Sequence, residues 1–157
     1  MAISKQEFRR CLGNFAAGVT VVTTRGAEGA PYGLTATAFT SVSLEPPLVL
    51  VCVDKKSESY PHFLASRIFA VNFLASDQEG VSRRFAVSGG DKFREVAWSR
   101  GATGAPILAD VLGFVDCEVE QVVEGGDHTI FVGRVVAGGC DETKTPLIYF
   151  RGNYCRI

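Results

Sequence analysis

The sequence of 157 residues has few of the side chains on which metal and disulfide chemistry depend. It contains two histidines and five cysteines, and no cysteines stand in a Cys-x-x-Cys spacing. An odd cysteine count without such spacing argues against a disulfide framework and against a zinc site, so we expect no metal. We interpret the cysteines as small, buried, apolar residues of a reducing compartment. They are Cys11, Cys52, Cys117, Cys140 and Cys155.

An excess of one charge and a long apolar run are also missing. The 16 basic residues nearly balance the 17 acidic ones, whereas a nucleic-acid-binding face needs a basic excess. No apolar run approaches the roughly 18 residues of a membrane-spanning helix. The first residues, Met-Ala-Ile-Ser-Lys-Gln-Glu, lack the apolar core of a signal peptide. We therefore expect a cytoplasmic protein with no nucleic-acid or membrane partner.

Three well-known catalytic and nucleotide-binding motifs are absent. There is no Gly-x-Gly-x-x-Gly, no phosphate loop ending in Gly-Lys-Ser/Thr and no Gly-x-Ser-x-Gly. A dinucleotide is thus not bound at the helix N-terminus of a Rossmann unit, and a serine hydrolase has no support.

The most informative stretch that is present runs from Gly33 to Leu44. Its residues alternate between two faces, which predicts a strand with one apolar and one hydroxyl-bearing face. The apolar face carries Leu34, Ala36, Ala38, Thr40, Val42 and Leu44, and the other carries Gly33, Thr35, Thr37, Phe39, Ser41 and Ser43. Small residues would let a flat ligand approach the backbone, but the pattern alone also fits an ordinary half-exposed strand.

The other patterns predict strands with short helices between them. Ser4 and Glu7 have capping-box spacing before an apolar helical face that Gly18 would end. Ser57 or Ser59 would begin a short helix, and Ser76 would cap another that runs to about Val87. Strands are expected at 19–24, 48–53, 67–74, 115–123, 129–137 and 146–150, with 91–108 mostly irregular.

These elements predict one domain over residues 1–157 that is mainly β. Alternating βαβ units are absent, which disfavours a parallel sheet. We expect an antiparallel β-barrel with peripheral helices.

Several motifs, in this order, resemble the flavin reductase family, the small reductase components of two-component flavin-dependent monooxygenases. Residues 33–53 read G-L-T-A-T-A-F-T-S-V-S-L-E-P-P-L-V-L-V-C-V. The further matches are V-N-F-L at 71–74, R-F-A at 84–86, D-K-F at 91–93, G-D-H at 126–128, V-G-R-V at 132–135 and P-L-I-Y-F-R-G-N-Y at 146–154. The resemblance implies a Greek-key split β-barrel that binds flavin at a homodimer interface.

The resemblance also implies which residues bind the flavin. The ring and ribityl chain would be lined by Gly33, Leu34, Thr35, Ala36, Thr37, Ala38, Phe39 and Ser41. The ribityl and phosphate groups would be approached by Cys52, Val53, Asp54, Lys55 and Ser57, and the phosphate end closed by Arg84, Phe85, Ala86 and Lys92. A phosphate does prefer hydroxyls, amides and one or two cations, although each basic residue taken alone also fits a solvated face.

By the same resemblance, His128 lies near the nicotinamide, where we expect it to orient the ring rather than transfer a proton. Taken alone, it also fits an exposed turn residue, and His62 has no expected chemical role. Arg151, Gly152, Asn153 and Tyr154 resemble the family's dinucleotide-contacting motif, although basic residues are usual where Asn153 and Cys155 stand.

The expected function is an NAD(P)H:flavin oxidoreductase that uses NADH or NADPH and FMN or FAD. Reduced flavin would pass to a monooxygenase or to another acceptor such as ferric iron. The alternatives are a flavoredoxin-like FMN electron carrier, reduced by a protein partner, and a flavin-storing or structural barrel without turnover.

Overall fold

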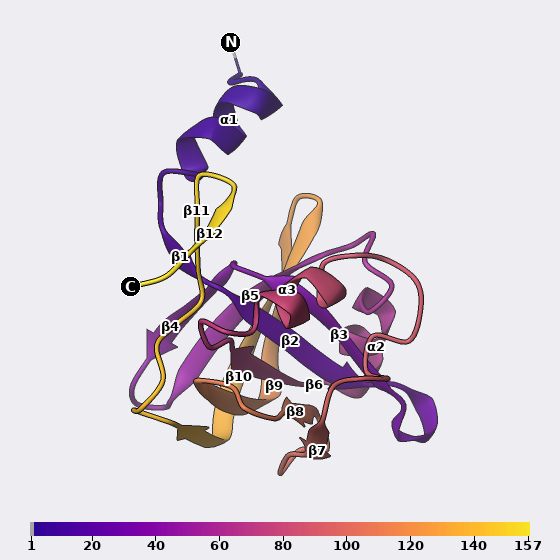
Figure 1. The fold of residues 1–157 in the computed structure, drawn as a ribbon. Coiled ribbons are helices and arrows are strands. Elements are labelled where there is room, and N and C mark those ends of the chain that lie inside the picture. The colour runs from indigo at the N-terminus through magenta and orange to yellow at the C-terminus, as the bar shows by residue number, and fades with distance from the viewer. Residues whose placement is uncertain (1) are drawn as a thin grey trace.

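The computed structural model describes residues 2–157, and antiparallel β structure dominates it (Figure 1). The largest sheet contains β2 (Thr20–Arg25), β3 (Pro31–Ala36), β4 (Phe39–Ser43), β5 (Leu48–Asp54), β6 (Ile68–Phe73), β9 (Gly113–Gly125) and β10 (His128–Cys140). Its seven strands follow the order β3-β2-β6-β9-β10-β5-β4, and every recorded pairing is antiparallel. The expectation of a mainly β, antiparallel fold is confirmed.

The first and last strands of this sheet, β3 and β4, are consecutive in the chain. Only Thr37 and Ala38 separate them, so the sheet curls until its two edges meet at these residues. No ladder joins β3 to β4 among the described residues, and the sheet is open along this line, which we call the seam. The amide of Cys52 on β5 donates to the carbonyl of Ala38 at 3.1 Å and fixes one side of the seam.

The prediction of one strand from Gly33 to Leu44 is therefore wrong. The chain changes edges at the seam, and the two faces do not continue across it. Leu34 and Ala36 do pack on the core, but Val42 is 49% exposed on the edge strand β4, and Leu44, in the turn after β4, is 96% exposed.

The main core lies inside the curled sheet. Its buried side chains include Val22, Val51, Phe69 and Phe131. Gly133 on β10 permits the close packing, since a Cβ atom there would lie 2.5 Å from the Phe69 ring. Burial raises the pKa of the Cys117 thiol to about 12, so this cysteine is the inert core residue we expected. Cys11 and Cys140 are exposed, contrary to that expectation.

The segment 98–108 is more regular than predicted. It forms a hairpin of β7 (Trp98–Arg100) and β8 (Pro106–Leu108). Asp116 on β9 is fully buried, and its carboxylate accepts bonds from the Thr103 amide (2.9 Å) and hydroxyl (2.5 Å). The loop of this hairpin thus covers β9 at Asp116.

Three α-helices lie outside the sheet within residues 2–157: α1 (Lys5–Leu12), α2 (Tyr60–Ser66) and α3 (Glu79–Phe85). The Ser4 hydroxyl accepts from the Glu7 amide, as the capping-box spacing predicted, but α1 ends at Leu12 rather than near Gly18. Gln78, not Ser76, occupies the N-cap of α3. In the described residues no helix is both long and apolar enough to cross a bilayer.

The helix α1 projects from the body of the molecule (Figure 1). At its base lies a small sheet of β1 (Ala17–Gly18), β11 (Ile148–Phe150) and β12 (Asn153–Cys155). The Arg151 amide donates to the Gly13 carbonyl at 2.8 Å, which ties the β11–β12 turn to the end of α1. None of the residues of α1 is buried.

Candidate active site

The seam places small side chains and free backbone at the surface. Thr37 and Ala38 are exposed, while Phe39 turns inward and packs against Phe73 with 5.2 Å between ring centroids. Ser41 follows on the exposed face of β4. A flat ligand can therefore lie against the backbone at Thr37 and Ala38 without meeting a large side chain.

Thr35 and Thr37 were both expected to line the flavin, but the structure gives them different surroundings. The Thr35 hydroxyl donates to the Ser82 carbonyl of α3 at 2.6 Å. The Ser82 hydroxyl bonds the Tyr154 hydroxyl at 2.7 Å, so β3, α3 and β12 are joined at Ser82. Thr35 thus holds the scaffold, and Thr37 is the exposed threonine of the two.

A small hollow of about 100 Å³ lies between β3, α2 and the segment after α3. The carbonyl of Gly33 accepts bonds here from the Ser59 hydroxyl (3.1 Å) and from Lys92 Nζ (3.5 Å). Burial lowers the pKa of Lys92, against an opposing effect of the Glu58 carboxylate. A half-buried cation beside a hydroxyl suits a phosphate group, although Glu58 and Asp91 also line the same hollow. The hollow is lined by Pro31, Tyr32, Gly33, Glu58, Ser59, Gly90, Asp91, Lys92 and Phe93.

His128 starts β10 opposite Asp54, the last residue of β5. Its Nδ1 lies 2.7 Å from the Asp127 carboxylate, and this hydrogen bond lowers the pKa of Asp127. The Lys55 amide donates to the Asp127 carbonyl at 3.0 Å, and Lys55 Nζ pairs with Glu124, which raises the pKa of Lys55. The end of β5 and the β9–β10 turn therefore form one charged cluster that contains His128.

The remaining predicted residues of the β5 end lie beside this cluster. The Asp54 carboxylate accepts from the Lys56 amide at 2.8 Å, and the Ser57 amide donates to the Asp54 carbonyl at 3.0 Å. The Ser57 hydroxyl oxygen accepts from the Ser59 amide at 3.3 Å. This turn leads from the charged cluster toward the small hollow.

Some predicted residues have no side chain available to a ligand. Val53 and Phe85 are buried in the core, and Leu34 and Ala36 pack against it, so a ligand could reach them only through the backbone. Arg84 pairs with Glu95 at 2.8 Å, and Ala86 is exposed beside it at the end of α3. Cys52 is half-buried, and burial raises the pKa of its thiol.

The C-terminal motif lies in the turn between β11 and β12, at the base of α1. Arg151 donates from Nε to the Asn14 side chain at 2.8 Å, and the Asn153 side chain donates to the Arg151 carbonyl at 3.1 Å. Arg151 and Gly152 both have positive φ, +49° and +78°. Within this motif, Tyr154 contacts α3: its hydroxyl bonds the hydroxyl of Ser82, whose carbonyl accepts from Thr35 on β3.

An apolar hollow of about 350 Å³, which the sequence did not predict, adjoins the seam. Thr37 and Phe39 line it together with Phe15, Phe73 and Leu112. The residues between α1 and β2 contribute to the same wall. Apart from Thr37 and Phe39, no local signal marks the lining, because it comes from five separate segments that only the curled sheet brings together.

These features define a small antiparallel β protein with a seam of small exposed residues, a polar hollow of about 100 Å³ and a histidine-bearing turn. The chain belongs to the family of flavin reductase like domains, whose model matches residues 12–157.

Relatives of this chain carry consistent descriptions. It is 46% identical to a flavin reductase (NADH) of Kitasatospora aureofaciens over 95% of this chain and 80% of that protein. It is 41% identical to the reductase subunit HsaB of a flavin-dependent monooxygenase of Rhodococcus jostii (strain RHA1), over 99% of this chain and 80% of that protein. The structure of the Streptomyces globisporus NADH:FAD oxidoreductase SgcE6, in complex with NAD and FAD fragments, superposes with a TM-score of 0.92 at 38% identity, over 100% and 96% of the two chains.

Proposed function

We propose that this protein is an NADH-dependent flavin reductase that supplies reduced flavin to a separate monooxygenase. The observation that carries the proposal is the seam, where exposed Thr37 and Ala38 lie on a strand junction of small residues beside a polar hollow. The descriptions of the relatives as NADH:flavin reductases and as a monooxygenase subunit support it. When bound, the flavin accepts a hydride from the nicotinamide and so supplies the redox chemistry.

The residues present fit such a group. The backbone from Gly33 to Phe39 and the hydroxyls of Thr37 and Ser41 would line the ring and ribityl chain, with Cys52 beside them. Lys92, with the turn from Asp54 to Ser57, would hold the phosphate end, and Lys92 already points at a polar carbonyl in the small hollow. The side chains of Leu34, Ala36, Val53 and Phe85 would support the site from behind. Arg84 and Ala86 would close the phosphate end, and Thr35 would support the site through its bond to the Ser82 carbonyl.

His128 would orient the nicotinamide over the ring. The bond from its Nδ1 to Asp127 would fix the imidazole plane and leave Nε2 for the substrate. Stacking geometry matters more for hydride transfer than proton donation, so this role needs no titration of the histidine. Arg151, Gly152, Asn153 and Tyr154 would contact the rest of the dinucleotide.

We also propose that the protein works as a homodimer. One copy leaves Phe8, Leu12 and Phe15 of the projecting N-terminal segment 53%, 54% and 79% exposed. Apolar side chains gathered on one arm suit a protein partner, and a second copy brings an identical arm and body.

One assay tests the function. Purified protein is mixed anaerobically with NADH or NADPH and with FMN, FAD or riboflavin, and loss of the oxidised flavin band is followed. Catalytic bleaching of an excess of free flavin is the expected result. The electron-carrier alternative would be favoured if at most one bound equivalent of flavin is bleached, and only when a reduced protein partner is added. No bleaching at all would overturn the proposal.

A further inference from the structure

The buried serine of α3 joins parts of the proposed site that are distant in the sequence. Ser82 is 0% exposed, and no motif marks it in the sequence. Its amide donates to the Gln78 carbonyl at 3.1 Å in the ordinary helical pattern. A serine hydroxyl in a helix often bonds a carbonyl of its own helix, but that of Ser82 bonds the Tyr154 hydroxyl on β12 at 2.7 Å. The side chain of Ser82 therefore makes a contact between elements.

Tyr154 is held from three directions. Besides the bond to Ser82, the Arg83 guanidinium lies 5.0 Å from the centroid of its ring, and the Tyr149 ring meets it edge-on with 5.3 Å between centroids. Both kinds of ring contact are favourable. Arg83 is in turn paired with Glu79 at 2.7 Å. These ring contacts do not depend on the tyrosine hydroxyl, so loss of the bond to Ser82 should shift Tyr154 without unfolding β12.

The backbone of Ser82 holds the other side of the site. Its carbonyl accepts from the Thr35 hydroxyl at 2.6 Å and from the Ala86 amide at 3.1 Å. Thr35 lies on β3, two residues before the exposed Thr37 of the seam. One residue thus joins the turn that is proposed to contact the dinucleotide to the strand that is proposed to carry the flavin ring.

We propose that Ser82 is a positioning residue for hydride transfer, which keeps the dinucleotide-contacting turn at a fixed place relative to the seam. The inference rests on the proposed function, because that function assigns Tyr154 to the dinucleotide and the seam to the flavin. Hydride transfer needs reacting atoms about 3–3.5 Å apart, and a misplacement of about 1 Å can cost up to about a hundredfold in rate. Ser82 touches neither ligand in this role and acts through Tyr154 and Thr35.

Removal of the two hydroxyls tests the contact from both of its ends. S82A loses the bond to Tyr154 but retains the carbonyl that accepts from Thr35, so the flavin side of the site is unchanged. Y154F removes the same bond and leaves the tyrosine ring packed on its core cluster. Because both variants remove one shared bond, S82A/Y154F should be no worse than either single variant.

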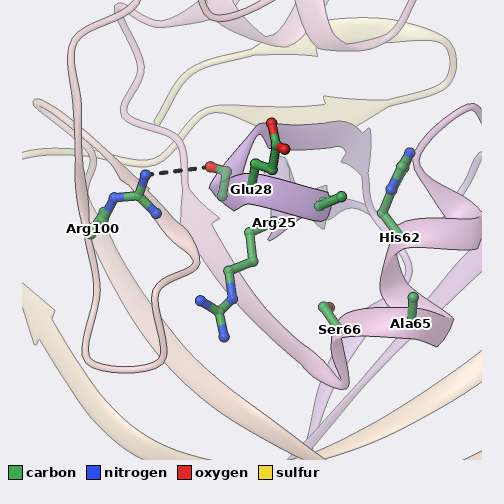
Figure 2. Close-up of a pocket in the computed structure, with 9 residues that line it drawn as sticks. Arg25, Glu28, His62, Ala65, Ser66 and Arg100 are labelled. Carbon is green, nitrogen blue, oxygen red and sulfur yellow. Dashed lines mark hydrogen bonds between the residues drawn. The ribbon is translucent and has the colours of Figure 1, made fainter.

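Ser66 on α2 provides the matched control. Its hydroxyl bonds the Thr24 hydroxyl, also at 2.7 Å and also partly buried. Ser66 lines a separate cavity of about 680 Å³ between the end of β2, the short 3₁₀ turn η1 (Ala27–Gly29) and the end of β7 (Figure 2). Within residues 2–157, that cavity is not lined by Ser82 or by any of its hydrogen-bond partners. S66A should therefore lose a comparable bond without changing the alignment of the two ligands.

Stopped-flow kinetics measure that alignment. FMN-loaded protein is mixed anaerobically with NADH, and the limiting rate of flavin reduction is compared for wild type, S82A, Y154F, S82A/Y154F and S66A. Flavin fluorescence gives the FMN dissociation constants, and circular dichroism checks the fold. We expect S82A and Y154F each to lower the limiting rate by about twofold to tenfold, the equivalent of one hydrogen bond, with FMN binding unchanged. The double variant should equal the single ones, and S66A should equal wild type.

Four results would overturn the inference. An unchanged limiting rate in both single variants would leave Ser82 a purely structural residue, and losses that multiply in the double variant would mean that the two hydroxyls act independently. An equal loss in S66A would make the effect one of general stability, and weaker FMN binding in S82A would place Ser82 in the flavin site. If S82A fails to fold, Y154F still tests the same bond. Failure of the proposed function looks different: wild type would then not reduce FMN with NADH, and this inference would fall with it.

Discussion

The chemistry of individual residues in this site depends on which groups already have partners. The hydrogen bond from His128 lowers the pKa of Asp127, so Asp127 carries its negative charge throughout the neutral range. The bond to Glu124 raises the pKa of Lys55, which therefore stays positive. A histidine whose Nδ1 is bonded to a carboxylate of fixed charge keeps its ring orientation, which suits positioning better than proton transfer.

Replacing His128 by alanine should slow the reductive half-reaction and spare flavin binding. Loss of one neutral hydrogen bond is worth about 1 kcal/mol, which corresponds to a several-fold weaker apparent affinity for NADH and a modest drop in limiting rate. Anaerobic stopped-flow mixing of the flavin-loaded protein with NADH measures both. H128Q, which retains a donor, should recover part of the loss.

A drop of about a hundredfold or more would instead indicate acid–base catalysis. Collapse of flavin binding would place His128 in the flavin site, and no effect would leave it an exposed turn residue.

Binding of a flavin phosphate should depend on pH through Lys92. Burial lowers the pKa of Lys92 from the ordinary value of 10.5, so the free protein loses this charge at a lower pH than an exposed lysine would. The FMN phosphate stays dianionic above its second pKa of about 6, and affinity should therefore fall as pH rises toward the pKa of Lys92. Titrations of FMN between neutral and alkaline pH measure this fall.

Riboflavin has the same ring without the phosphate, and its affinity should lack the component due to Lys92. In K92M the difference between FMN and riboflavin should shrink and become independent of pH. If the wild-type protein binds FMN and riboflavin with the same affinity at every pH, Lys92 does not bind the phosphate.

At the scale of elements, local patterns predicted the strands that end at turn-forming or polar residues. The apolar run before Asp54 and the alternation that Gly125-Gly126-Asp127 interrupts appear as β5, β9 and β10. The break at Thr37–Ala38 has no glycine or proline, and strand order alone places β3 and β4 on opposite edges of the sheet. The helix α3 shows a similar limit: it begins after Gln78, whose side chain makes no capping bond but accepts from the Ala75 amide at 2.9 Å, and no pattern in the sequence marks that start.

The candidate site was predictable only as far as it is continuous in the chain. The seam strand and the Asp127–His128 turn carry recognisable motifs. Phe15, Ser59 and Tyr32 line the hollows around them, but they belong to elements whose approach depends on how the sheet curls. Nor could alternation distinguish Thr35 from Thr37, since the partner of Thr35 lies 47 residues away on α3.

Separate replacement of Thr35 and Thr37 by valine tests whether the first supports the fold and the second binds the flavin. T35V removes a partly buried bond to Ser82 and should cost about 0.5–1.5 kcal/mol in free energy of unfolding, with little direct effect on flavin affinity. T37V should leave stability unchanged and weaken flavin binding by a similar free energy, if its hydroxyl bonds the ring. Denaturant titration and flavin fluorescence measure the two effects. The reverse assignment, with T35V weakening flavin binding in a fully stable protein, would contradict the division of roles drawn here.

For the molecule as a whole, the main question is what covers the projecting arm. Helix α1 has Arg9 and Arg10 on one side and Phe8 and Leu12 on another, and none of its residues is buried. Complete burial of a Phe or Leu side chain is worth about 1.5–3 kcal/mol, so burying these two side chains would contribute substantially to the stability of the proposed dimer. The arm begins where the β11–β12 turn is tied to Gly13, close to the proposed dinucleotide motif.

The double variant F8E/L12E should therefore convert a wild-type dimer into monomers, because each carboxylate would have to be buried without a partner. Sedimentation equilibrium or light scattering measures the mass, and far-UV circular dichroism should show an intact fold, since both side chains are exposed in a single copy. Q6E adds a negative charge on the other face of α1 and should remain dimeric.

If the flavin site is completed by the second copy, the monomer should also bind flavin more weakly than Q6E. A monomeric wild type that binds flavin at full affinity would refute the dimer proposal, and a dimeric F8E/L12E would place the interface elsewhere on the body.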